Sequence, residues 1–72
     1  MGYDLWDIST GNLIYYSDAK DEALAFVREA IATYGRRYVT DWALQHVDAD
    51  GTIHVVARGT ALAARAAKIV PA

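Results

Sequence analysis

The stretch VDADGTIHVV places two aspartates and a glycine at the spacing that a calcium-binding EF-hand loop uses for ligands and a sharp turn. Gly51 would take the invariant sixth position, with Asp50 at the fifth and Asp48 at the third. The pattern fails at both ends, because His46 would be the first ligand and Ala57 would replace the bidentate glutamate at position twelve. Aspartate and glycine are also the expected residues of a hairpin turn, so we interpret the stretch as a turn and predict no metal site.

Both histidines of the chain flank this turn, one on each side. If the flanking strands pair, His46 faces His54, and facing residues of a non-hydrogen-bonded pair have Cβ atoms about 5 Å apart. Two imidazoles at that separation can bind a shared ligand such as a transition metal, or titrate together near neutral pH. Two ligands do not complete a metal site, so we interpret the pair as interface or sheet-edge residues and expect no cofactor. A ligand-binding or pH-sensing role for His46 and His54 is the open alternative.

The remaining polar residues do not indicate a catalytic site. Ser9 is in a turn and Ser17 ends a strand, and neither has the general base and orienting group that a nucleophile needs. The sequence contains no glycine-rich phosphate loop and no HExxH motif. We predict a protein that is not an enzyme, although a homo-oligomer can assemble a site that one chain does not contain.

Two helices are predicted. The first spans residues 19–34, where apolar residues recur at the 3, 4, 7, 8, 11 spacing of one helical face. Asp18 is the expected N-cap, and Gly35 supplies a left-handed stop. The second helix is the segment ALAARAAKIV, with Thr60 as its N-cap and Pro71 as its end.

Four runs rich in β-branched and aromatic residues predict strands. They cover residues 3–8, 12–18, 38–47 and 52–57. The expected fold class is therefore α+β, in the order ββαββα, with two β-hairpins forming a sheet that packs against two helices.

The two halves of the chain echo each other within a single domain of residues 1–72. The first ββα unit covers residues 1–35 and the second covers residues 36–72. Gly11 and Gly51 both come third in a three-residue hairpin loop, the position that a type I turn with a G1 bulge fills with a left-handed glycine. The halves align at an offset of forty residues, which fits either an internal duplication or convergent hairpin chemistry.

The turn type predicts which residues face each other across each hairpin. The expected pairs are Trp6 with Ile14, Asp4 with Tyr16, His46 with His54, and Leu44 with Val56. Alternation then assigns one side of the sheet to the core beneath the helices: Leu5, Leu13, Tyr15, Ala43, Val47, Ile53 and Val55. The opposite side would carry Trp6, Ile8, Ile14, Tyr16, Trp42, Leu44, His46, His54 and Val56.

That opposite side is more apolar than the surface of a lone soluble domain usually is. Either a partner covers it, or the two helices lie on opposite faces of the sheet and both faces are core. We favour a partner, because the chain has only two helices and the second is short. The residues expected at this interface are Trp6, Ile14, Tyr16, Trp42, Leu44 and Val56.

The run WDISTGNLIYYSDAKDEALAFVREAI, from Trp6 to Ile31, resembles a small bacterial domain family that has no assigned activity. The similarity consists of a WD hairpin, a Gly-Asn turn and an acidic helix start that contains EAL. It covers most of the first ββα unit, and YVTDWAL extends it. The resemblance implies no catalytic or binding residue for this chain.

Size and charge limit the possible partners. A chain of 72 residues without cysteine has one small core and no disulfide, so oligomerisation is the expected source of added stability. A net charge of −2 disfavours sequence-independent binding to the phosphate backbone of nucleic acid. The N-terminus has no signal-peptide pattern and no segment is long and apolar enough to span a membrane, so we expect a soluble, cytoplasmic protein.

These observations predict a non-enzymatic protein-interaction or regulatory module, which forms a homodimer or binds another protein through the apolar side of its sheet. One alternative is a nucleic-acid-binding module that uses the sheet aromatics together with Arg36 and Arg37. Another is a binder of a small apolar ligand at a dimer interface.

Overall fold

The computed structural model describes residues 2–69 and confirms an α+β fold in the order ββαββα. A short 3-10 helix, η1, connects the two units. The elements are β1 (Gly2–Asp7), β2 (Asn12–Ser17), α1 (Lys20–Tyr34), η1 (Arg36–Val39), β3 (Trp42–Val47), β4 (Ile53–Arg58) and α2 (Gly59–Ala67).

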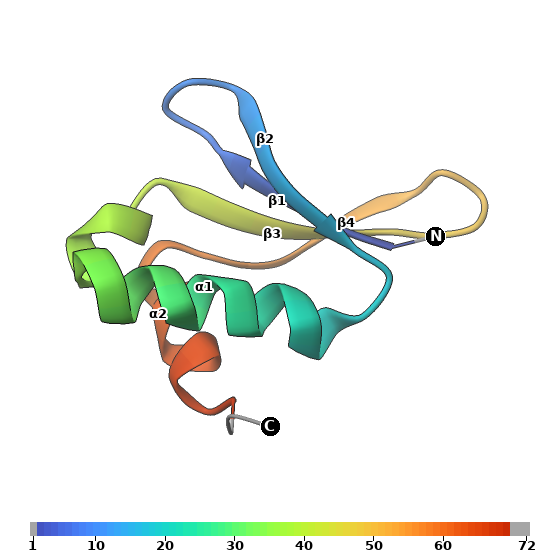
Figure 1. The fold of residues 1–72 in the computed structure, drawn as a ribbon. Coiled ribbons are helices and arrows are strands. Elements are labelled where there is room, and N and C mark those ends of the chain that lie inside the picture. The colour runs from blue at the N-terminus through green and yellow to red at the C-terminus, as the bar shows by residue number, and fades with distance from the viewer. Residues whose placement is uncertain (1, 70–72) are drawn as a thin grey trace.

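The molecule has two layers, a four-stranded sheet and a layer of helices on one of its faces (Figure 1). The strand order is β2-β1-β3-β4, and every neighbouring pair is antiparallel. The helix α1 contacts β1 and β2, whereas α2 contacts β3 and β4, and the two helices pack against each other. Both helices therefore cover the same side of the sheet, and the other side faces away from them.

The core lies between the two layers and draws residues from nearly every element. Its largest fully buried side chains are Leu5, Val27, Val39, Leu44 and Leu62. Leu5 and Leu44 are direct partners in the ladder between the central strands, so the middle of the sheet meets Val27 of α1 and Leu62 of α2. This single cluster ties both ββα units together.

The helix ends differ from the sequence prediction at their N-termini. Asp18 is not the N-cap of α1. That position is Ala19, whose N–H donates to Ser17 Oγ at 3.1 Å, while the Asp18 carboxylate accepts a hydrogen bond from the Tyr16 hydroxyl. The helix α2 begins at Gly59, one residue before the predicted cap Thr60. It ends at Ala67, earlier than the predicted segment ALAARAAKIV, and the predicted stop at Pro71 lies outside the described residues.

The end of α1 is as predicted. Gly35 has φ 93°, and its N–H donates to the Ile31 carbonyl at 2.8 Å. The strand predicted from residue 38 begins instead at Trp42, because residues 36–39 form η1. That turn buries Val39 completely, so the connection contributes to the core before β3 begins.

The second hairpin has the predicted three-residue loop, but the first has a four-residue loop, residues 8–11, because Asp7 pairs with Asn12. Both turn glycines have the predicted positive φ. Gly11 has φ 71° and Gly51 has φ 87°, which is the left-handed region that favours glycine. The N–H of Gly11 donates to the Asp7 carbonyl at 2.8 Å, and that of Gly51 donates to the Asp48 carbonyl at 3.0 Å.

Each edge strand contains a bulge that the sequence did not reveal. In β2 the extra residue is Ile14, because Leu5 pairs with Tyr15 and Trp6 pairs with Leu13. In β4 the extra residue is Val56, because Leu44 pairs with Ala57 and Gln45 pairs with Val55. The predicted pairs Trp6 with Ile14 and Leu44 with Val56 are therefore wrong, whereas Asp4 with Tyr16 and His46 with His54 are confirmed.

The bulges and the pairing of Leu5 with Leu44 correct the assignment of sheet faces. Trp42 and Leu44 are 6% and 0% exposed in the core, and Ile14 and Val56 pack against it. These four side chains were predicted on the opposite side. Conversely, five residues predicted in the core alternate to the side away from the helices: Leu13, Ala43, Val47, Ile53 and Val55. Leu5 and Tyr15 were assigned correctly.

Candidate interaction surface

The side of the sheet that faces away from the helices is the candidate surface, here called the outer face. Its apolar and aromatic members come from all four strands: Trp6, Leu13, Tyr16, Val47, Ile53 and Val55. Four of them are half exposed or more, with exposed fractions of 51% for Leu13, 50% for Tyr16, 59% for Ile53 and 58% for Val55. Large apolar side chains are thus concentrated on a side that neither described helix covers (Figure 1).

Strand pairing explains how these side chains come together. Ile53 pairs with Val47 and Val55 pairs with Gln45, so both exposed residues of β4 lie beside the central strand β3. At the other edge, Leu13 pairs with Trp6. The central strands add the polar side chains of Asp4 and Gln45 to the same face. Arg58, which pairs with Ala43, adds a charge at the end of β4, so the outer face is most apolar around Leu13, Tyr16, Ile53 and Val55.

Tyr16 is held flat against the neighbouring strand. Its hydroxyl donates to Asp18 Oδ1 at 2.8 Å, and this hydrogen bond to a carboxylate raises the pKa of the Tyr16 phenol. The ring lies beside the buried Gly2, and a Cβ atom built at that glycine would overlap the ring. Tyr16 therefore presents a fixed aromatic surface on the outer face.

Of the six interface residues predicted from the sequence, the structure brings only Trp6 and Tyr16 to the outer face. The other four lie on the helix side, as described above. Sequence reasoning missed Leu13, Ile53 and Val55 as exposed residues. The consecutive apolar residues of β2 and β4 do indicate that both faces of each edge strand are apolar. The bulges decide which of these residues point to which face, and no residue type marks a bulge.

The two histidines do face each other, and a carboxylate joins them. His46 Nδ1 lies 3.2 Å from Asp48 Oδ1, and His54 Nε2 lies 3.0 Å from Asp48 Oδ2. His46 also pairs with Tyr3 and stacks on its ring with a centroid distance of 4.7 Å. This cluster therefore lies on the helix side of the sheet, and the prediction that both histidines face away from the helices is wrong. Within residues 2–69 no group of three or more histidine, cysteine or acidic side chains is arranged to hold a metal ion.

The acids of the two turns hold their own loops. Asp7 Oδ1 accepts from both the N–H and the hydroxyl of Ser9, at 3.0 and 2.6 Å. Asp50 Oδ1 accepts from the N–H of Thr52 at 2.9 Å. These hydrogen bonds favour the ionised carboxylates, so the pKa of each lies below its usual range, chiefly because of Ser9 and Thr52.

The arrangement behind the nucleic-acid alternative is not formed. Arg36 and Arg37 belong to η1, which packs against α1 and α2 in the helix layer. The aromatic residues of the outer face, Trp6 and Tyr16, lie on the other side of the sheet. The third predicted aromatic residue, Trp42, lies on the same side as the two arginines but is buried, so the predicted combination is not presented on one surface.

Comparison of the chain with protein-family models, curated proteins and solved structures found no match. The resemblance of residues 6–31 to a bacterial domain family thus stays a prediction. None of the described helices is long and apolar enough to cross a membrane.

Proposed function

We propose that this chain is a non-enzymatic interaction or regulatory module that forms a homodimer through its outer face. The observation that carries the proposal is the exposure of four large side chains, Leu13, Tyr16, Ile53 and Val55, on the side of the sheet opposite the helices. A sheet with helices on one face ordinarily has polar residues on the other, because water solvates that face. Burial of the apolar outer face by a second copy would remove this unfavourable exposure.

The size of the molecule supports a face-to-face contact. The Cα atoms extend 35 × 30 × 17 Å, and the short dimension corresponds to the two stacked layers. The broad face therefore offers on the order of 800 Å², which matches the surface that each partner of a standard interface buries. A domain with a core this small also gains the most from such burial.

The strand order favours one particular arrangement. A two-fold axis parallel to the strands superimposes β1 of one subunit on β3 of its partner, because the order β2-β1-β3-β4 is reversed by the rotation. The edges of the two sheets would meet as β2 on β4, with Tyr16 over Val55 and Leu13 over Arg58 of the partner subunit.

The solution mass at micromolar concentration tests this proposal directly. One chain has a mass of 7.9 kDa, so we expect about twice that value by light scattering coupled to size exclusion. Substitution Val55→Lys introduces a charge on β4, where it would meet β2 of the partner subunit, and should give a monomer. The matched control is Tyr34→Lys, which changes a side chain that is 64% exposed on the helix layer and should leave the dimer intact.

A monomeric wild-type protein at these concentrations would contradict the homodimer. Loss of the dimer in Tyr34→Lys but not in Val55→Lys would also contradict it, because the contact would then involve the helix layer. Circular dichroism of each variant distinguishes loss of association from loss of folding.

We further propose an intracellular, cytoplasmic location. The chain has no cysteine, which is compatible with a reducing compartment.

A further inference from the structure

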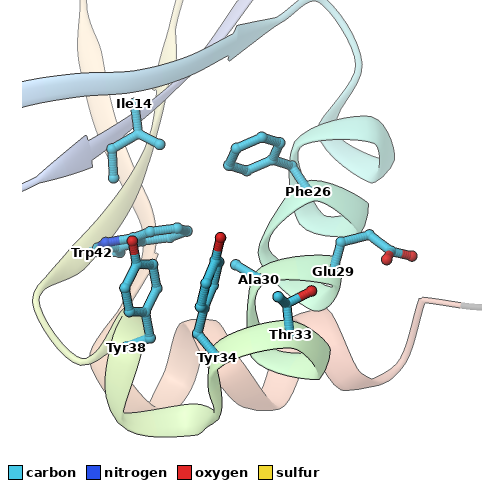
Figure 2. A pocket seen from close by; sticks show the side chains of 8 residues that line it. All are labelled: Ile14, Phe26, Glu29, Ala30, Thr33, Tyr34, Tyr38 and Trp42. Atoms are coloured by element: carbon cyan, nitrogen blue, oxygen red, sulfur yellow. The ribbon is translucent and has the colours of Figure 1, made fainter.

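A groove lined by aromatic rings lies on the helix side of the molecule, away from the outer face. It has a volume of about 350 Å³ and is formed by the C-terminal half of α1, η1, the start of β3 and one residue of β2. This volume lies within the range of small-molecule sites. The lining residues are Ile14, Phe26, Glu29, Ala30, Thr33, Tyr34, Tyr38 and Trp42, drawn in Figure 2.

Four rings form its walls. Trp42 is almost completely buried, and its ring centroid lies 6.2 Å from that of Phe26. Tyr38 meets Trp42 edge-on, with a centroid distance of 5.7 Å and an interplanar angle of 67°. Tyr34 stacks on Tyr38 at 4.4 Å, so both tyrosines stand steeply against the indole plane. Figure 2 shows the rings of Phe26, Tyr34 and Trp42 around one open space.

The charge around this groove has one sign. Glu29 is the charged residue among the eight that line it. Glu22 lies one helical turn before Phe26 on the same face of α1 and accepts a hydrogen bond from the Tyr15 hydroxyl at 3.0 Å. All seven lysine and arginine residues of the chain line other surface hollows: Lys20, Arg28, Arg36, Arg37, Arg58, Arg65 and Lys68.

Arg28 does not neutralise the groove. Its guanidinium lies 3.7 Å from the Glu29 carboxylate, which is a long contact between adjacent helix residues that do not share a face. The Glu29 side chain is 74% exposed, so its carboxylate is free to turn toward a bound cation. The faces of the rings add negative electrostatic potential to that of the carboxylate.

We propose that the aromatic groove binds a small organic cation with a quaternary ammonium head. Such a cation is attracted by ring faces and by Glu29, while its methyl groups bury apolar surface against Phe26 and Trp42. A guanidinium fits less well, because its five N–H donors would lose water and find few acceptors on walls made of rings. The site is independent of the proposed dimer, since it lies on the opposite side of the sheet.

Choline and 3,3-dimethylbutan-1-ol form a matched pair of probes, because they share a shape and differ in the positive charge. Titration of the full chain, followed by the two indole N–H signals in an amide spectrum, separates the surfaces, since Trp42 lines the groove and Trp6 lies on the outer face. We expect choline to shift the Trp42 signal with a dissociation constant on the order of millimolar. The alcohol should bind at least about threefold more weakly.

Two variants test the residues that carry the proposal. Tyr34→Ala removes a ring that is 64% exposed and should weaken choline binding about threefold, and Glu29→Gln should weaken it about twofold at low ionic strength. The control Tyr16→Ala removes a ring from the outer face and should leave choline binding unchanged.

Three outcomes would overturn the proposal. Equal binding of the alcohol would mean an apolar groove without preference for charge. A response centred on Trp6, or no response at Trp42, would mean that the groove is not the site. Unchanged choline affinity in both Tyr34→Ala and Glu29→Gln would remove the residues on which the inference rests.

Discussion

Leu44 is the residue at which the register of the whole sheet can be tested. It faces Leu5 across the two central strands, and both side chains are fully buried between the sheet and the helices. Truncation of a buried leucine removes its transfer free energy and leaves a cavity. We therefore expect Leu44→Ala to lower the free energy of unfolding by about 2–5 kcal/mol in a urea titration.

The control for Leu44→Ala is Ile8→Ala, at a residue 53% exposed in the first turn, which should change the free energy of unfolding by less than about 0.5 kcal/mol. Similar, small losses in both variants would mean that Leu44 lies on the surface, as the alternation of the sequence had suggested.

Asp7 and Asp50 give the stability a defined dependence on pH. Ser9 and Thr52 lower the pKa of these carboxyls, so the folded state favours their ionised forms more than the unfolded state does. Their contribution is fully present above about pH 4 and is lost as the pH falls through the lowered values. Melting temperatures measured from pH 7 to pH 2 should fall in the acid range.

The double variant Asp7→Asn/Asp50→Asn isolates this contribution. Asparagine keeps an acceptor oxygen but cannot ionise, so the variant should lose less stability between pH 5 and pH 2 than the wild-type protein. Identical pH profiles for the two proteins would mean that the turn carboxylates do not contribute.

At the scale of elements, the turn glycines contribute through their backbone conformation. Gly51 has φ 87°, and among the described residues nothing lies within 4 Å of a Cβ atom built there. We expect Gly51→Ala to cost about 1 kcal/mol in unfolding free energy, because alanine is strained in the left-handed region. Gly51→Asn should cost less, since asparagine tolerates that region, and an equal cost for both would contradict this explanation.

How far the sequence predicts these elements depends on whether the controlling signal is local. The periodicity of residues 19–34, the stop at Gly35 and the turn glycines are local, and each was predicted correctly. The bulges at Ile14 and Val56 lie inside hairpins whose strands pair as predicted, and no residue type in the sequence marks them. The pairing of Leu5 with Leu44 joins residues 39 positions apart, so no hairpin rule specifies it.

The periodicity of helices and strands in the sequence also does not predict the aromatic groove. Phe26, Tyr34, Tyr38 and Trp42 lie at multiples of four residues, but the chain passes from α1 through η1 into β3 along this run. The end of α1 at Gly35 and the tight turn of η1 together bring the four rings around one space (Figure 2).

At the scale of the whole molecule, association and stability should be linked. If folded chains are dimers, the melting temperature rises with protein concentration, because mass action favours the associated state. For a dimer of two chains of this length, we expect the melting temperature to rise by about 4 °C for each tenfold increase in protein concentration. Calorimetry of Val55→Lys over the same concentrations should show no such rise, and a concentration-independent wild-type protein would contradict the dimer.

The outer face and the aromatic groove lie on opposite sides of the molecule, so they should act separately. The monomeric variant Val55→Lys should therefore bind choline as the wild-type protein does, by the same titration of the Trp42 signal. Loss of binding in this variant would mean that the groove is complete only in the dimer.

The bulge at Val56 also determines where this chain tolerates a change of length. Ile53 and Val55 point to the outer face and Ala57 to the core, with Val56 as the extra residue between them. Deletion of Val56 would leave a strand with regular alternation, in which every remaining side chain keeps its face. The same is true of Ile14 in β2. Elsewhere in the ladder, a deletion moves every residue beyond it to the opposite face of the sheet. Val56 and Ile14 are therefore the positions where natural variants of this fold can lose a residue while the core and outer-face side chains keep their sides.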